Sequence, residues 1–186
     1  MAGRVVYSMN VSLDGYVADP EGALDWSIVD EEIHAWWNAR IDEVSVELYG
    51  RRLYETMAAY WPYALDDADA GPVTLEFARI WQRTPKVVFS STLDAVVPPC
   101  RLVREDVVAA LPGLREEFGG DLSIGGPTLA AALVRRGLVD VYRPVVHPVA
   151  IGGGTPYLPA GARVGLRLTD THRFANGAVM LEYVPA

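Results

Sequence analysis

The sequence predicts an α/β protein in which a mostly parallel central sheet is covered by helices on both faces and ends in an antiparallel hairpin. Short apolar β-type runs alternate with amphipathic helical segments along the chain, which is typical of parallel strands joined by crossover helices. The clearest such unit is the strand Asp121–Ile124, the turn Gly125-Gly126-Pro127-Thr128 and the helix Leu129–Arg136. Near the C-terminus, two β-type segments flank Asn176-Gly177, a pair typical of a hairpin turn. No linker-like stretch or internal repeat interrupts the chain, so a single domain is predicted over residues 1–186.

The first part of the chain is predicted to form two strands and a helix. Arg4–Met9 has the apolar character of a buried strand, and Tyr16–Ala18 is predicted as a short second strand. Asp30–Ile41 is predicted to be helical, because Asp30 can cap it and apolar residues recur within it at helical spacing.

The middle of the chain alternates between the two kinds of element. Val44–Tyr49 and Lys86–Phe89 are predicted strands, whereas Arg51–Ala59 and Val73–Arg83 are predicted helices. The acidic, alanine-rich segment Ala64–Gly71 between these helices is predicted to be a disordered loop.

Prolines complicate the elements of the second half. Asp106–Phe118 is predicted to be mostly helical, with Pro112 breaking or restarting the helix because proline lacks an N–H donor. Val139–Val146 is predicted to be a long strand broken by Pro144 and Pro148. The strands that flank Asn176-Gly177 are predicted at Arg167–Phe174 and Val179–Val184.

Composition excludes several classes of function. The 186 residues carry a net charge of −8, which argues against nucleic acid or an anionic membrane as a partner. Cys100 is the single cysteine, and the histidines are far apart in the sequence, so we expect neither a disulfide nor a metal site. No apolar run approaches the roughly 18 residues of a membrane span, and the N-terminus lacks the pattern of a signal peptide, so a cytoplasmic protein is expected.

The glycine turn after Ile124 has the features of a phosphate site. Gly125 and Gly126 allow a tight bend and leave no Cβ to block a ligand. Pro127 suits a first helical position, so the helix should begin there and direct free N–H groups and the positive end of its dipole at the same point. These features together suit a pyrophosphate, although a tight turn without a ligand would use the same residues.

Two further predicted strands end in loops that suit phosphate. Gly50-Arg51-Arg52 places two arginines in the first turn of a helix, where the dipole disfavours them unless an anion binds there or they face solvent. Ser90-Ser91-Thr92 offers hydroxyls that could donate to a phosphate or merely cap a turn. The chain has neither the dinucleotide fingerprint Gly-x-Gly-x-x-Gly after a strand nor a Walker A lysine motif. A dinucleotide spread over three loops is the interpretation that these patterns favour.

With these motifs in their order, the chain resembles the dihydrofolate reductase-like superfamily, in particular the branch related to the reductase domain of the riboflavin-pathway deaminase–reductase. The resemblance covers nearly the whole chain. It rests on these segments: Ser12-Leu13-Asp14-Gly15, Gly50-Arg51-Arg52-Leu53-Tyr54-Glu55, Ser90-Ser91-Thr92-Leu93, Ile124-Gly125-Gly126-Pro127-Thr128 and Pro148-Val149-Ala150-Ile151-Gly152-Gly153-Gly154-Thr155-Pro156.

The resemblance implies NADPH as the cofactor. It implies that Gly50, Arg51 and Arg52 lie near the phosphates, and that Gly125, Gly126 and Thr128 contact the pyrophosphate. It further implies Ser90, Ser91 and Thr92 near the adenosine 2′-phosphate. It also implies that Met9, Asp14 and Trp26 bind the substrate.

The sequence identifies the residues that would transfer a proton to the substrate less clearly. Folate reductases carry an acid on their first helix, and here Asp30, Glu31 and Glu32 stand at the predicted helix start. These acids either cap the helix and complement its dipole, or Asp30 or Glu31 hydrogen-bonds an N–H edge of a heterocycle and relays a proton. His147 is expected to be a strand histidine whose ring is satisfied by backbone, and Cys100 a passive residue.

The expected function is that of an NADPH-dependent reductase that transfers a hydride to a small heterocyclic or carbonyl-containing substrate. A narrower alternative is 5-amino-6-(5-phosphoribosylamino)uracil reductase. Tyr16 weighs against it, because the riboflavin-pathway enzymes have lysine or arginine at that place. An alternative of another class is a nucleotide- or pterin-binding module without catalysis. Members of the resembled family commonly pair, and the chain is rich in tryptophan and tyrosine, so a homodimer is also expected.

Overall fold

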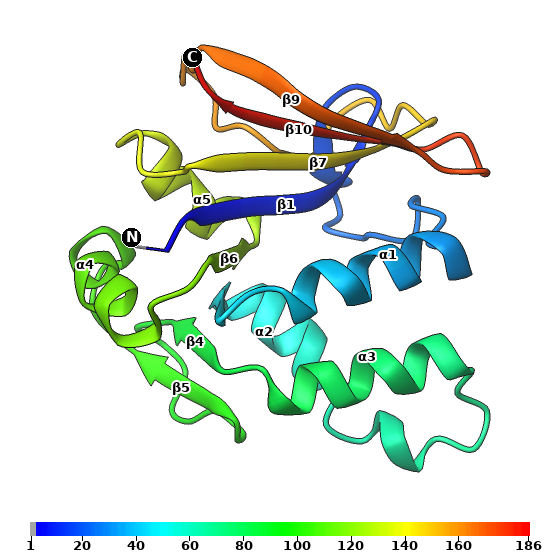
Figure 1. Cartoon of the computed structure of the whole chain (residues 1–186), viewed down its shortest axis with the longest axis vertical. Coiled ribbons are helices and arrows are strands. Elements are labelled where there is room, and N and C mark those ends of the chain that lie inside the picture. Colours follow the sequence, from blue (N-terminus) through cyan, green and yellow to red (C-terminus); the bar gives the residue numbers. More distant parts are fainter. Residues whose placement is uncertain (1–2) are drawn as a thin grey trace.

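A computed structural model describes residues 3–186 and shows a central eight-stranded sheet with helices on both faces (Figure 1). The strand order is β5-β4-β3-β6-β1-β7-β10-β9. Strands from β5 to β7 pair in parallel, whereas β10 is antiparallel to both β7 and β9. A small separate sheet joins β2 to β8. The predicted α/β fold, with a mostly parallel sheet and a C-terminal antiparallel hairpin, is therefore confirmed.

The elements follow the predicted order closely. They are β1 (Val5–Ser12), β2 (Tyr16–Ala18), α1 (Glu31–Asp42), β3 (Val46–Gly50), α2 (Arg51–Ala58), the 3₁₀ helix η1 (Ala64–Asp66), α3 (Pro72–Arg83), β4 (Lys86–Phe89), β5 (Cys100–Val103), α4 (Val107–Phe118), β6 (Leu122–Gly125), α5 (Pro127–Val134), β7 (Val141–His147), β8 (Thr155–Pro156), β9 (Leu166–Arg173) and β10 (Val179–Pro185).

Neither Pro112 nor Pro144 breaks its element, so these two predicted breaks are wrong, whereas Pro148 directly follows the end of β7. Pro112 lies inside the continuous helix α4, where Leu111 and Leu114 are buried on either side of it and hold the helix against the sheet. Pro144 lies inside β7, opposite Met9 of β1. The pairing of β7 with β10 has a gap at Arg143 and Pro144, so the missing N–H of Pro144 removes no bond from that ladder.

Two segments have more regular structure than the sequence predicts. Cys100–Val103 forms β5, which pairs with β4 and is one of the two outermost strands of the sheet. The acidic segment Ala64–Gly71 contains η1, where Ala64 is fully buried and Asp67 accepts a hydrogen bond from Tyr60 Oη at 2.7 Å. Burial of one alanine and this hydrogen bond therefore anchor a stretch whose composition suggests disorder.

The core lies on both faces of the sheet. On one face α4 and α5 cover the central strands, and Tyr7 stacks on Tyr157 with ring centroids 4.3 Å apart. Each of these two hydroxyls donates to the other residue's carbonyl oxygen at 2.9 Å, which fixes the segment after β8 to β1. On the opposite face Ile33 of α1 packs against Val145 and the hairpin residue Phe174.

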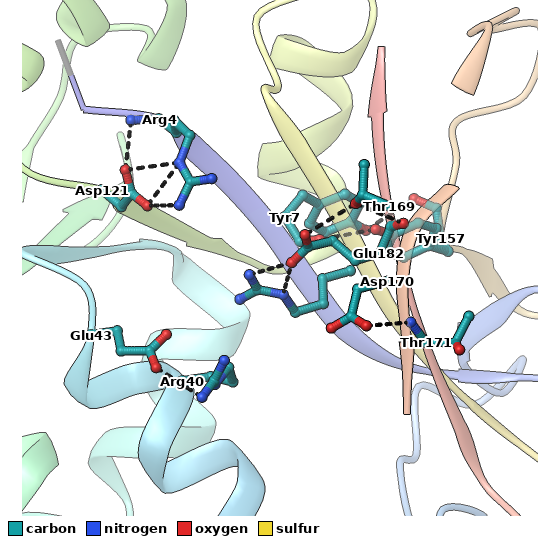
Figure 2. A network of polar contacts seen from close by, with 11 residues as sticks. Arg4, Tyr7, Arg40, Glu43, Asp121, Tyr157, Thr169, Asp170, Thr171 and Glu182 are labelled. Atoms are coloured by element: carbon teal, nitrogen blue, oxygen red, sulfur yellow. Dashed lines mark hydrogen bonds and ion pairs between the residues drawn. The ribbon is translucent and has the colours of Figure 1, made fainter. Parts of the chain in front are cut away.

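Ion pairs join neighbouring strands of the sheet (Figure 2). Arg4 binds Asp121 with its backbone N–H and its guanidinium, which ties β6 to the residue before β1. Arg143 of β7 donates twice to Glu182 of β10, and Thr169 of β9 donates to the same carboxylate at 3.1 Å. The antiparallel hairpin is thereby linked to the parallel part of the sheet by charge as well as by its backbone ladder.

A buried ion pair connects β3 to β4. Lys86 Nζ lies 3.5 Å from Glu47 Oε2, and both side chains are almost completely buried. Lys86 also donates to the carbonyl oxygens of Trp81 and Thr84, at the C-terminal end of α3. Burial lowers the pKa of Lys86 and raises the pKa of Glu47, and the attraction between the two charges opposes both shifts.

Replacing Lys86 should therefore be costly. Lys86→Met should lower the free energy of unfolding by about 3–5 kcal/mol, because it leaves Glu47 buried without a counter-charge. The double variant Lys86→Met/Glu47→Leu should recover part of the loss, since an apolar pair needs no counter-charge.

Urea unfolding measures both effects. Glu117→Gln, which breaks the exposed pair of Glu117 with Arg101, serves as the control and should cost less than about 1 kcal/mol. A Lys86→Met protein as stable as this control would contradict the stabilising role of the buried pair.

Candidate functional site

The carboxyl ends of five neighbouring strands form one edge of the sheet. Strands β4, β3, β6, β1 and β7 are consecutive and parallel, so their carboxyl ends face the same way. In sheets of this kind, ligands bind at that edge. The loops predicted to bind phosphate follow β4, β3 and β6, which are direct neighbours. The fold therefore brings the three predicted loops side by side.

Two helices that begin at this edge have no side-chain cap. The N-cap residues of α2 and α5 are Gly50 and Gly126, and no acidic residue lies in either first turn. In contrast, Asp30 caps α1 and Asp106 caps α4 with carboxylates that accept hydrogen bonds from the first turn. The opening N–H groups of α2 and α5 are thus left for another acceptor, and both helix dipoles favour an anion there.

The starts of α2 and α5 lie against each other. A Cβ on Gly50 would lie 3.6 Å from Leu129 Cβ, and a Cβ on Gly126 would lie 3.8 Å from Leu53 Cβ. A Cβ on Gly125 would overlap the end of the Leu53 side chain, so a larger residue here would force Leu53 to move. Gly126 has φ +92°, a backbone conformation that glycine alone adopts readily. The two helix N-termini therefore form one continuous surface, of the kind that favours an anion.

The loop after β4 is held by its own hydrogen bonds and by an arginine. Ser90 Oγ accepts from the backbone N–H of Thr92 at 3.2 Å and of Leu93 at 3.1 Å. Arg104, which follows β5, donates to the carbonyl oxygens of Ser91 and Leu93 at 3.1 and 2.8 Å. A guanidinium thus lies beside the predicted hydroxyl loop, and Ser91 and Thr92 remain exposed.

Both predicted arginines lie in the first turn of α2 and are exposed. Arg51 pairs with Glu55 one turn later at 3.3 Å, so its charge is partly balanced within the helix. Within residues 3–186, Arg52 forms no ion pair. Thr128 is the exposed second residue of α5, beside the glycine turn.

The other half of the edge, at β1 and β7, carries a cluster of polar and aromatic side chains. Asn10 Oδ1 lies 3.2 Å from Trp37 Nε1 of α1 and 3.2 Å from His147 Nε2 at the end of β7. Trp26 meets the His147 ring edge-on, with centroids 5.8 Å apart, and its Nε1 is buried without a hydrogen-bond partner. Burial lowers the pKa of His147, and the charge of Asp30 partly offsets this.

The three predicted substrate residues lie in different surroundings. Trp26 belongs to the cluster around His147, as just described. Met9 Sδ accepts a hydrogen bond from the backbone N–H of Gly126 at 3.4 Å, so it lies where the two halves of the edge meet. Asp14 accepts from Ser12 Oγ, which is the main cause of its lowered pKa, and from the backbone N–H groups of Ile151 and Gly152 at 3.1 and 2.7 Å. It joins the loop after β1 to the loop after β7.

The acids at the start of α1 have structural contacts. Asp30 accepts from the backbone N–H of Ile33 at 3.0 Å and caps the helix. Glu32 accepts from the backbone N–H of Ala175 at 2.8 Å and ties α1 to the hairpin turn. Glu31 is exposed in the first turn. Of these acids, Asp30 acts on the electrostatics of the His147 cluster.

Sequence reasoning missed Asn10 and Arg104 at this edge and assigned His147 a different environment. His147 bonds the side chain of Asn10 and not backbone, which corrects its expected environment. Asn10 escaped notice because the first strand was predicted to end at Met9, whereas β1 continues to Ser12. With that extension, the alternation of Ser8, Asn10 and Ser12 would have marked a polar strip on one face. Arg104, which follows β5, could be placed only once that strand was known.

Two surface hollows lie away from this edge. One of about 410 Å³ is lined by α4 and Leu138, and another of about 400 Å³ by the end of α5 and residues 160–164. In the part of the chain that the structure describes, no group of three or more His, Cys, Asp or Glu residues is arranged to hold a metal ion. Within that same part, no helix is long and apolar enough to cross a bilayer.

Similar proteins share both the sequence pattern and this fold. The uncharacterized protein YyaP of Bacillus subtilis (strain 168) is 26% identical over 182 residues, which cover 97% of this chain and 94% of that protein. A putative riboflavin biosynthesis protein from Shewanella sp. PV-4 superimposes with a TM-score of 0.74 at 20% identity, covering 98% of this chain and 99% of that one. Dihydrofolate reductase from Enterococcus faecalis, solved in complex with NADP(H), gives a TM-score of 0.67 at 14% identity over 100% of this chain and 98% of that one.

These similarities confirm the resemblance that the motifs suggest. The strand order and the antiparallel C-terminal hairpin are those of the dihydrofolate reductase-like fold. The sequence profile of the RibD C-terminal domain matches residues 4–180, which is nearly the whole chain. The protein therefore belongs to the RibD C-terminal domain family.

Proposed function

We propose that the protein is an NADPH-dependent reductase that transfers a hydride to a small heterocyclic or carbonyl-containing substrate. The observation that carries this proposal is the pair of uncapped helix N-termini at Gly50 and Gly126, side by side at the carboxyl edge of the sheet. The Enterococcus faecalis enzyme of similar fold, which is a reductase complexed with NADP(H), supports the choice of cofactor.

The residues at the edge fit a dinucleotide with an additional phosphate. The N–H groups at the starts of α2 and α5, with Gly125, Gly126 and Thr128, would hold the pyrophosphate. Arg51 and Arg52 would add charge near it. Ser90, Ser91 and Thr92 would hold the 2′-phosphate, and Arg104, braced on the carbonyls of that loop, would balance its charge. When bound, NADPH supplies the hydride.

The substrate would then lie toward β1 and β7. Trp26 and Asn10 line this half, and Met9 lies between it and the pyrophosphate residues. Asp30 and Glu31 remain our proposed acids for holding an N–H edge of the substrate, and Asp14 supports the adjoining loops. The narrower activity, reduction of 5-amino-6-(5-phosphoribosylamino)uracil, is favoured by the family match. It is disfavoured by Tyr16, which is uncharged where a phosphorylated ribose would need a cation.

We also propose a cytoplasmic homodimer built from one domain per chain. Exposed aromatic side chains, such as Tyr63 at 63% exposure, are consistent with a contact between copies. Light scattering should give about twice the 20.3 kDa of one chain; a mass equal to one chain would exclude the dimer.

A side-chain cap introduced at the start of α2 should have opposite effects on protein stability and on NADPH binding. Gly50→Asp should satisfy the first turn of α2 with its own carboxylate and raise the free energy of unfolding by about 0.5–1 kcal/mol. The same carboxylate should repel NADPH and weaken its binding by about tenfold or more, since one charge-assisted bond contributes about 1.5–3 kcal/mol. Urea unfolding and titration calorimetry measure the two effects.

Gly71→Asp is the matched control. Gly71 is the uncapped N-cap of α3, has open space around its Cα and follows η1, not a strand of the main sheet. This change should give a similar gain in stability and leave NADPH binding unchanged. If Gly50→Asp bound NADPH as tightly as the wild type, the start of α2 would have no part in the cofactor site.

The preference between NADPH and NADH tests the role of the β4 loop. The wild type should bind NADPH about tenfold to a thousandfold more tightly than NADH, through one or two charge-assisted bonds to the 2′-phosphate. Arg104→Ala should reduce the preference by about tenfold and leave NADH affinity nearly unchanged. Arg51→Ala and Arg52→Ala should differ, because Arg51 alone is paired with Glu55.

The ratio of the dissociation constants for NADPH and NADH, measured in the wild type and in each variant, gives this preference. Arg163→Ala, which removes an exposed arginine near the opposite end of α5, should leave both constants unchanged. Equal binding of NADPH and NADH by the wild type would remove the 2′-phosphate from the proposal. A preference kept in Arg104→Ala but lost in Arg52→Ala would move the 2′-phosphate to α2.

A further inference from the structure

The orientation of the Asn10 amide is fixed by Trp37. An indole Nε1 carries a hydrogen and can only donate, so the Asn10 atom 3.2 Å from Trp37 Nε1 must be the amide oxygen. The opposite orientation of the amide would set two N–H groups against each other. The usual ambiguity between the two ends of an asparagine side chain is therefore resolved by chemistry at this position.

The same oxygen determines the tautomer of His147. Asn10 Oδ1 also lies 3.2 Å from His147 Nε2, and an amide oxygen can only accept. Nε2 must therefore carry the hydrogen, and in the neutral ring Nδ1 then carries none. Trp37 and His147 both donate to one oxygen, and the amide nitrogen of Asn10 points away from both.

The surroundings of His147 keep the ring neutral but able to titrate. His147 is 2% exposed, and this burial lowers its pKa. The charged group that acts on it is Asp30 at the start of α1, which opposes the shift. The contacts from β1, α1 and the loop before it are neutral: Asn10, Trp37 and Trp26. Trp26 Nε1 is buried and has no hydrogen-bond partner. His147 Nδ1, in contrast, is not a buried atom without a partner.

We propose that Asn10 and Trp37 hold His147 as the Nε2–H tautomer, which makes Nδ1 the atom through which the substrate end of the site exchanges a proton. Asn10 and Trp37 are positioning residues in this arrangement. The role of His147 Nδ1 in catalysis rests on the proposed reductase function. During reduction of a C=N or C=O group, the hydride from NADPH would form the new C–H bond. The proton on Nδ1 of the imidazolium would pass to the neighbouring nitrogen or oxygen, and Nδ1 would regain a proton from water while Nε2–H stayed on Asn10.

Nitrogen NMR of protein carrying ¹⁵N-labelled histidine tests the proposal without a substrate. At about pH 8, more than one unit above the ordinary histidine pKa, neutral His147 should show a protonated Nε2 and an unprotonated Nδ1. On acidification the Nδ1 signal should move as the proton binds there, with a midpoint below about pH 6.5. His34 and His172, which lie outside the cluster, serve as internal references.

Two variants test the cause of the tautomer. Trp37→Phe keeps an aromatic ring but removes the donor, so the Asn10 amide can turn and neutral His147 should show both tautomers. Adding Asn10→Asp to this variant should restore the pure Nε2–H form, because a carboxylate can only accept. A merely structural role for the cluster would not produce this loss and rescue.

Two results would overturn the proposal. One is a wild-type ring protonated on Nδ1 at about pH 8, and the other is a Trp37→Phe protein with the wild-type tautomer. The proposed function is tested separately by NADPH binding, which His147→Gln should leave unchanged. A protein that shows the predicted tautomer but binds no NADPH would refute the proposed function and leave only the assignment of the His147 tautomer intact.

Discussion

The parallel pairing of β3, β6 and β1 is the constraint on which the rest of the site depends. Its register sets Tyr49 beside Gly125 and Tyr7 beside Ile124, so β3 and β6 end level and the helices that follow them start together, whereas β1 continues to Ser12. As a result α2 and α5 begin in contact, and neither has a side-chain cap. Capping a helix contributes about 1 kcal/mol, and this chain uses aspartate caps at α1 and α4. The cofactor that we propose would accept from both of these uncapped helices, whereas α3, which also lacks a side-chain cap, follows η1 and does not start from the sheet.

Along the same edge the chemistry divides into two halves. Toward β4 it is cationic and rich in backbone donors, on a chain whose net charge is −8. Toward β7 it consists of aromatic rings, one amide and one buried histidine. Met9 joins the halves through its bond from Gly126, and Asp14 joins the loops after β1 and β7. This division matches what hydride transfer requires, because an anionic cofactor and a flat, weakly charged substrate must meet at their ends.

Most of the fold and the meeting of the three glycine- and hydroxyl-containing loops at one edge could be predicted from sequence, because glycine, proline and helix-start patterns act over a few residues. Gly125 and Gly126 revealed the turn in this way, and the structure adds that Leu53 fills the space a side chain would need. The effects of Pro112 and Pro144 were mispredicted, because tertiary packing around Leu111 and the gap in the β7–β10 ladder outweigh local preference. The cluster of Asn10, Trp37 and His147 could not be predicted, since these residues lie far apart in sequence and meet only through strand register and the position of α1.

Backbone amide chemical shifts on addition of NADPH test the central claim most directly. The account predicts that the largest changes occur at the amides of Arg51, Arg52 and Leu53 and of Thr128 and Leu129. These are the N–H groups that open α2 and α5 and have no partner within their helices. The amides of the capped helices α1 and α4 should change little. Saturable binding whose largest shifts fall at α1 or α4, or shifts absent from one of the two uncapped helices, would contradict a site shared between α2 and α5.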